Sequence, residues 1–196
     1  MKDNNVLAIL LLIGLAFLLK SKKRRQSGAK TVVKLPQPPP VTIKPKKPSN
    51  WLAYRELLAQ KESAGKYDAR RPKSRYWGRY QLGPNARKIG GAQGIKWADY
   101  KKNQPLQDQA VKTWTARLFR EITNHPTTGA AIGKTLHGEK ITPALLVAMD
   151  HLTGRAATMR FVRTGKTTKD GNGIENLTYA RPFRDFDLSE LRKATA

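Results

Sequence analysis

The stretch WLAYRELLAQKE, residues 51–62, indicates how the chain folds. Its large apolar side chains recur three and four residues apart, the period of an amphipathic α-helix, at Trp51, Tyr54, Leu57 and Leu58. Ser49 or Asn50 is available as its N-cap. Glu62 follows Leu58 by four residues, so it lies at the end of the apolar face. A carboxyl there is either partly removed from water, as suits a general acid, or a surface group at a frayed helix end.

The chain beyond this stretch also favours helices. Residues 105–123 place Leu106, Ala110, Trp114, Leu118 and Ile122 on one face. Residues 143–152 follow Thr142 and precede Gly154, which are typical start and stop signals. Shorter helices are expected at residues 128–136 and 155–163. No stretch alternates with a period of two and no internal repeat is evident, so we predict a mainly α fold.

Composition divides the 196 residues near Asn50. Residues 51–196 mix apolar, charged and turn residues as a globular domain does, and their number suits one domain. Residues 1–50 instead hold an apolar run, a basic cluster and a proline-rich stretch. The chain has no cysteine, which excludes disulfides, thiolate metal sites and cysteine nucleophiles.

The formal net charge of +24 is spread over both parts of the chain. Residues 1–50 carry 11 basic and one acidic side chain, and residues 51–196 carry 27 and 13. This balance favours polyanionic partners, which include nucleic acid, anionic lipid and the acidic polymers of a bacterial wall. Aromatic and basic residues alternate around residues 75–80, but no known nucleic-acid-binding motif is present there.

Residues 1–25 are predicted to form a membrane anchor. Val6 to Leu19 are uninterrupted apolar positions that span about 21 Å as a helix, against a hydrocarbon core of about 30 Å. Flanking Asn4, Asn5 and Lys20 can extend the span, and the absence of a small-x-small cleavage site favours an anchor over a cleaved signal.

Residues 26–50 follow as a linker rich in proline and lysine, expected to be extended as polyproline II. The alternative is a docking peptide for a proline-recognising domain.

Two short motifs suggest a function for the domain. Glu62 and Ser63 are followed by Gly78-Arg-Tyr-Gln-Leu-Gly-Pro84. This sequence resembles the lytic transglycosylase family of the lysozyme superfamily, which couples a Glu-Ser pair to a later Gly-x-x-Gln-x-x-Pro segment. The resemblance implies a lysozyme-like α or α+β fold in which Glu62 is the sole catalytic acid and base. It further implies that Ser63 supports the site and that the glycan cleft is lined by Gly78, Tyr80 and Gln81.

The resemblance continues toward the carboxyl end and covers most of residues 51–184. Asp150 to Gly154 depart from the family's Ala-Tyr-Asn-x-Gly and keep only the glycine, so His151 either replaces a cleft contact or packs in the core. Tyr179 is either the family's late cleft tyrosine or a packing residue. Residues 170–173 lack the later ligands of a calcium loop and are predicted to form a turn. No metal or cofactor is expected.

The resemblance implies cleavage of peptidoglycan strands between N-acetylmuramic acid and N-acetylglucosamine, with a 1,6-anhydro product. If Asp68 acts as a second carboxylate, the enzyme would instead be a hydrolytic lysozyme. The rival interpretation is a noncatalytic, basic, membrane-anchored protein that binds nucleic acid or other virion proteins.

Five basic residues follow the apolar run and only Lys2 precedes it, so the domain is expected on the cytoplasmic side of a single-pass anchor. A wall-cutting domain made there is consistent with storage in the internal membrane of a bacterial virus; the alternative is the bacterial inner membrane. Protease should therefore cleave the domain in inverted vesicles and spare it in right-side-out vesicles. The opposite pattern would contradict this topology.

Overall fold

The computed structural model describes residues 51–193, so the expected anchor and linker of residues 1–50 lie outside the described residues. The described part is mainly helical, which confirms the prediction of a mainly α domain. No helix in this range is long and apolar enough to cross a membrane. The elements are α1 (Trp51–Ser63), α2 (Pro84–Ile89), α3 (Trp97–Tyr100), α4 (Gln104–Asn124), α5 (Pro126–Ala131), β1 (Thr135–Leu136), β2 (Glu139–Lys140), α6 (Pro143–Thr153), α7 (Arg155–Thr164), α8 (Asn176–Ala180) and the 3-10 turns η1 (Arg181–Phe183) and η2 (Ser189–Lys193).

Helix α6 is the centre of the core. Every side chain from Ala144 to Met149 is 0% exposed, and the helix packs against α4, α7, α8 and η1. A helix covered on all sides must be apolar on all sides, which the sequence PALLVAM provides. Thr142 Oγ1 caps its first turn by accepting from Leu145 N at 3.2 Å, and Gly154 follows its last residue.

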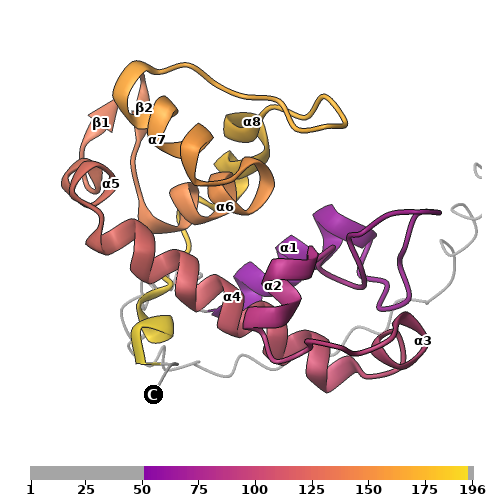
Figure 1. Ribbon diagram of the computed structural model, residues 1–196. Helices are drawn as coiled ribbons and strands as arrows, with labels where there is room; N and C mark the ends of the chain where they lie inside the picture. Colours follow the sequence, from indigo (N-terminus) through magenta and orange to yellow (C-terminus); the bar gives the residue numbers. More distant parts are fainter. Residues whose placement is uncertain (1–50, 194–196) are drawn as a thin grey trace, which may run out of the picture. The chain divides into compact units, whose positions relative to one another are not determined.

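Helix α4 packs against α2 and α3, which precede it in the chain, and against α5, α6 and η2, which follow it. Figure 1 shows α2 and α3 toward one end of α4 and α5 at the other. The side chain of Asn103 caps the helix by accepting from Leu106 N at 3.0 Å, and Pro105 occupies its first turn. Ala110, Val111 and Ile122 are 0% exposed on the face that meets the core.

Helix α1 packs through Tyr54 and Leu58, both 0% exposed. The Tyr54 ring lies 4.8 Å from that of Phe183 in η1. At the first residue, Trp51 N donates a hydrogen bond of 2.9 Å to Glu190 of η2. These contacts fix α1 at its start and middle, and its last turn carries Glu62 toward α8.

The predicted helices at residues 51–62, 105–123, 143–152 and 155–163 are confirmed to within one residue at each end. The helix predicted at residues 128–136 is wrong in its bounds. His125 Nδ1 accepts from Thr127 N at 3.1 Å and starts α5 at Pro126, two residues early. After Ala131 the chain forms the antiparallel hairpin β1-β2, whose two-residue strands are too short to show alternation. Residues 170–173 form the predicted turn.

Replacing Gly90 by alanine should destabilise the domain. A Cβ atom at this position would lie 2.5 Å from Ala110 Cα, where α2 packs against α4, so the backbone must shift. We expect a loss of about 1–3 kcal/mol in the free energy of unfolding, measured by urea denaturation of the full chain in detergent. Gly171→Ala is the control, because a Cβ there meets nothing within 4 Å. Equal unfolding midpoints for the two variants would contradict the close approach of α2 to α4.

Candidate active site

Glu62 lies in the last turn of α1, and side chains from two other helices meet its carboxyl group. The Tyr179 hydroxyl on α8 donates a hydrogen bond of 2.5 Å to Glu62 Oε1. His151 Nε2 on α6 lies 3.8 Å from the same oxygen. The Glu62 side chain is 15% exposed and that of His151 is 7% exposed, so both are shielded without being sealed from solvent. Three segments distant in sequence therefore form the site.

Two buried phenols surround the carboxyl group. Burial, together with the negative charge and hydrogen bond of Glu62, raises the pKa of Tyr179 well above the usual value of about 10. Burial first, and then the charge of Glu62, raise the pKa of Tyr54 in the same direction. The Tyr54 hydroxyl has no hydrogen-bond partner among the described residues. At neutral pH Tyr179 is therefore protonated and serves as a donor to Glu62.

A second carboxylate, Asp150, adjoins His151 in sequence but is occupied by an arginine. Arg155 Nε donates to Asp150 Oδ2 at 2.5 Å, and its Nη2 donates to Glu121 at 2.9 Å. Burial raises the pKa of Asp150, and the hydrogen bond and charge of Arg155 only partly offset that effect. Arg155 at the start of α7 thus joins Asp150 at the end of α6 to Glu121 of α4.

His151 also lines a pocket of about 320 Å³. The rest of its lining comes from residues 75–86 and from Trp114 of α4. Gln81 belongs to this lining, and its side-chain amide nitrogen donates to Ala69 O at 3.1 Å and to Gly78 O at 2.8 Å. His151 therefore borders both the pocket and Glu62, although Glu62 is not itself part of the pocket lining.

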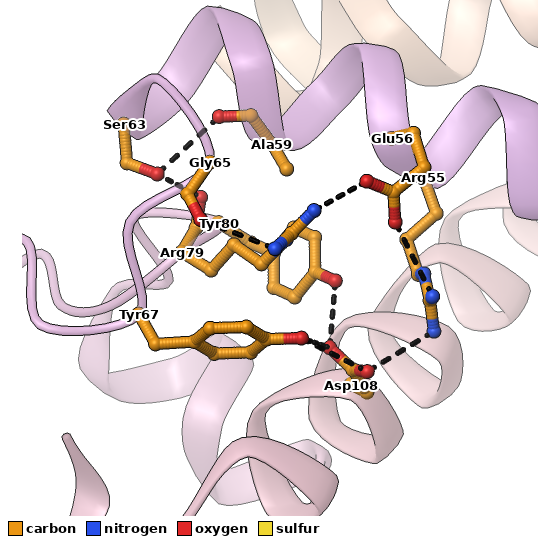
Figure 2. Close-up of polar contacts among 9 residues, drawn as sticks. All are labelled: Arg55, Glu56, Ala59, Ser63, Gly65, Tyr67, Arg79, Tyr80 and Asp108. Atoms are coloured by element: carbon orange, nitrogen blue, oxygen red, sulfur yellow. Dashed lines mark hydrogen bonds and ion pairs between the residues drawn. The ribbon is translucent and has the colours of Figure 1, made fainter. Parts of the chain in front are cut away.

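Figure 2 shows the polar network that fastens the loop of residues 64–83 to its neighbours. Ser63 Oγ donates to Arg79 O at 2.8 Å, and Arg79 Nη1 donates to Gly65 O at 3.1 Å. The Arg79 guanidinium also pairs with Glu56 on α1. These bonds hold the loop that carries Gln81 against the end of α1, beside Glu62.

Asp108 of α4 holds the other side of the same network (Figure 2). Its carboxylate accepts hydrogen bonds from the Tyr80 hydroxyl at 2.7 Å and the Tyr67 hydroxyl at 3.0 Å. Arg55 of α1 pairs with it at 3.2 Å. Two loop tyrosines and one helix arginine therefore converge on one carboxylate, which joins the loop, α1 and α4.

Gln107 of α4 and Gly78 of this loop lie in close contact. The Gln107 side chain is 0% exposed, and its oxygen accepts from Arg79 N at 2.9 Å. A Cβ atom at Gly78 would lie 2.1 Å from that oxygen, and the Gly78 φ is +74°. Only glycine combines this backbone conformation with the space that the amide occupies.

The structure brings together four of the residues singled out from the sequence: Glu62, Gln81, His151 and Tyr179. The His151 side chain is largely buried but lines the pocket, and Tyr179 packs against Phe183 at 5.6 Å while it bonds Glu62.

Other predicted residues lie elsewhere. Tyr80 was expected to line the cleft, but its side chain is 1% exposed and bonded to Asp108, so that expectation is corrected. Gly78 is buried against the Gln107 side chain. Ser63 holds the loop of residues 64–83 through its hydrogen bond to Arg79 O. Asp68 is exposed and lines a different pocket, and no hydrogen bond or ion pair joins it to Glu62 in the described residues.

Sequence reasoning missed the residues that shape the pocket and fasten the loop. Tyr76 and Trp114 line the pocket, while Gln107 and Asp108 hold the loop. Trp114 was assigned only to an apolar helix face. The signal available for Gln107 was its position among the apolar residues of α4, where a polar side chain that is buried must find partners.

No family model, curated protein or solved structure matches this chain. The resemblance to lytic transglycosylases therefore rests on the motif residues themselves.

Removal of the hydroxyl group should change the free energy of unfolding differently at the two buried tyrosines, Tyr179 and Tyr54. Tyr179→Phe removes a hydrogen bond to a charged group and should lower the free energy of unfolding by about 1.5–3 kcal/mol. Tyr54→Phe removes a buried hydroxyl without a described partner and should be neutral or slightly stabilising. Urea denaturation at pH 7 measures both. Equal destabilisation by the two variants would contradict the assigned bond to Glu62.

Proposed function

We propose that this protein is a lytic transglycosylase that cleaves peptidoglycan strands between N-acetylmuramic acid and N-acetylglucosamine. The observation that carries the proposal is the environment of Glu62. One oxygen of its carboxyl group is held by Tyr179, and Oε2 has no hydrogen bond or ion pair to another described residue. A partly shielded carboxyl group with one oxygen held by a donor and the other without a partner suits a general acid.

In the proposed reaction, Glu62 donates its proton to the glycosidic oxygen as the bond from that oxygen to the muramyl C1 breaks. Positive charge develops at C1, and the muramyl 6-hydroxyl oxygen attacks it. The proton of that hydroxyl returns to the Glu62 carboxylate, which restores the acid and leaves a 1,6-anhydro ring. Tyr179 is a donor throughout, so it holds the orientation of Glu62 in both proton transfers.

The surroundings of Asp68 and Asp150 favour the lyase over a hydrolytic lysozyme that would use either of them. A hydrolase of the common type needs a second carboxylate about 5–10 Å from the acid, to act as nucleophile or to activate water. Asp150 is engaged by Arg155, and Asp68 is exposed in a different pocket. An internal hydroxyl nucleophile requires neither of them.

The proposal extends to how the enzyme reaches its substrate. Residues 1–25 would anchor the protein in the internal membrane of a virus particle, with residues 26–50 as the spacer that lets the domain reach the wall. The bacterial inner membrane remains the alternative location.

Glu62→Gln keeps the size of the side chain and removes the acid. We expect this variant to lose wall-lytic activity by about 10²-fold or more, measured as clearing of purified peptidoglycan by the full chain in detergent. Asp185→Asn is the matched control, because it makes the same chemical change at a side chain that is 74% exposed. Activity retained by Glu62→Gln would refute the role of Glu62. An inactive parent protein would favour the noncatalytic alternative.

A further inference from the structure

Residues 64–102, here called the basic segment, concentrate positive charge. They hold 11 basic and two acidic side chains and comprise the loop after α1 together with α2 and α3. Elsewhere in the described part, arginines such as Arg155 and Arg181 pair with carboxylates. Among the described residues, the one salt bridge made by the basic segment joins Arg79 to Glu56. Its other cations therefore make no salt bridge within this range.

Several of these cations surround a pocket of about 380 Å³. Its lining includes Asp68, Arg70, Arg71, Lys73, Trp97 and Lys101. Four cationic side chains thus border a single carboxylate and an indole ring. This arrangement differs from a uniformly basic surface, because one negative group is set among the positive ones.

The arginines of this pocket are held in place. The Arg70 guanidinium lies 5.1 Å from the centre of the Trp77 ring and 5.6 Å from that of Trp97. Arg71 Nη1 donates to Asn172 Oδ1 at 2.8 Å. Side chains that are already ordered lose less conformational freedom when a ligand binds, so such cations are better suited to recognition than free surface lysines.

A further cation, Arg87, lies at the same Trp77 ring as Arg70 and makes no salt bridge in the described residues. The Arg87 guanidinium is 3.8 Å from the centre of the Trp77 ring and donates to the backbone oxygens of Leu82 and Arg75. Burial lowers the pKa of Arg87, and the charge of Arg70 also acts to lower it. The positive charges of Arg70 and Arg87 therefore both lie close to the Trp77 ring. An anion bound near them would reduce their mutual repulsion.

The basic segment also borders the proposed active site. Arg75, Tyr76 and Gln81, on the loop that carries Arg70 and Arg71, line the pocket that His151 also lines, and His151 Nε2 lies 3.8 Å from Glu62 Oε1. The same loop therefore lines both pockets, so a glycan strand bound at one can present its substituents to the other. On peptidoglycan, those substituents are short peptides on the muramyl residues.

The chemistry of such a peptide matches the pocket. A muramyl stem peptide carries several carboxylates and, on its diamino acid, an amine. The cations of the pocket complement the carboxylates, and Asp68 complements the amine. A nucleic-acid backbone carries phosphates alone, which Asp68 would repel.

We propose that the pocket of Asp68, Arg70, Arg71, Lys73 and Lys101 binds the stem peptide of peptidoglycan, so that the enzyme selects peptide-bearing strands. This inference rests on the proposed function, because it takes the strand at Glu62 to be peptidoglycan. The peptide then supplies binding energy away from the bond that is cleaved.

The test measures binding of the full chain in detergent to two insoluble substrates. One is purified peptidoglycan with its peptides, and the other is the same material stripped of peptides by an amidase. All proteins carry Glu62→Gln, so that cleavage does not interfere. The test variant adds Arg71→Gln, Lys73→Gln and Lys101→Gln, and the matched control adds Lys112→Gln, Lys134→Gln and Lys166→Gln, which removes the same charge from exposed positions outside the basic segment.

The test variant should bind peptide-bearing material about tenfold more weakly than the control, which is the effect of a few exposed ion pairs. On stripped material the two variants should bind alike, and both should bind more weakly than the control binds the intact form. Equal binding of both variants to intact material would overturn the inference. So would a test variant that binds duplex DNA more weakly than the control does but binds intact peptidoglycan equally well. Failure of the proposed function is distinct, because it appears as an uncleaved substrate with Glu62 intact.

Discussion

The carboxamide of Gln107 joins backbone segments that no regular secondary structure connects. Its oxygen accepts from Arg79 N, and its nitrogen donates to Tyr67 O at 3.1 Å and Tyr100 O at 2.9 Å. The side chain is 0% exposed, so each of these bonds is made away from water, where leaving a polar group unpaired is costly. This side chain of α4, together with the neighbouring Asp108, holds the shape of the loop of residues 64–83. Through that loop, the two side chains also hold Gln81 beside the pocket.

Much of the helical fold could be predicted because its signals are local. Apolar residues at helical spacing and caps such as Thr142 and Gly154 define α6 without knowledge of its neighbours. The short helices α2, α3 and α8 were not predicted, because four to six residues carry too little periodicity. For α2, the Pro84 at its start was an available signal. The bounds of α5 depended on a cap made by His125, a residue that rarely serves in that role.

Residues of the candidate site could be predicted from the sequence only where they belong to a motif. Glu62 and Gln81 were found through their spacing, whereas the bond between Glu62 and Tyr179 joins residues 117 positions apart. Tyr80 was misplaced because a motif position does not say which way its side chain points. The loop residues that bond to Gln107 and Asp108 are Tyr67, Arg79 and Tyr80, which lie 28 to 41 positions away in the sequence, and no sequence period relates them. The side chains with proposed chemical roles were therefore easier to predict from the sequence than the packing that positions them.

The central claim is that Glu62 cleaves the strand alone and that the strand's own hydroxyl replaces water. Mass spectrometry of the soluble products tests this most directly. The account predicts muropeptides that end in 1,6-anhydro-N-acetylmuramic acid and that take up no ¹⁸O when the reaction is run in labelled water. Products with reducing N-acetylmuramic acid ends that carry one ¹⁸O atom would contradict it, because they would require a hydrolytic water and a group to activate it.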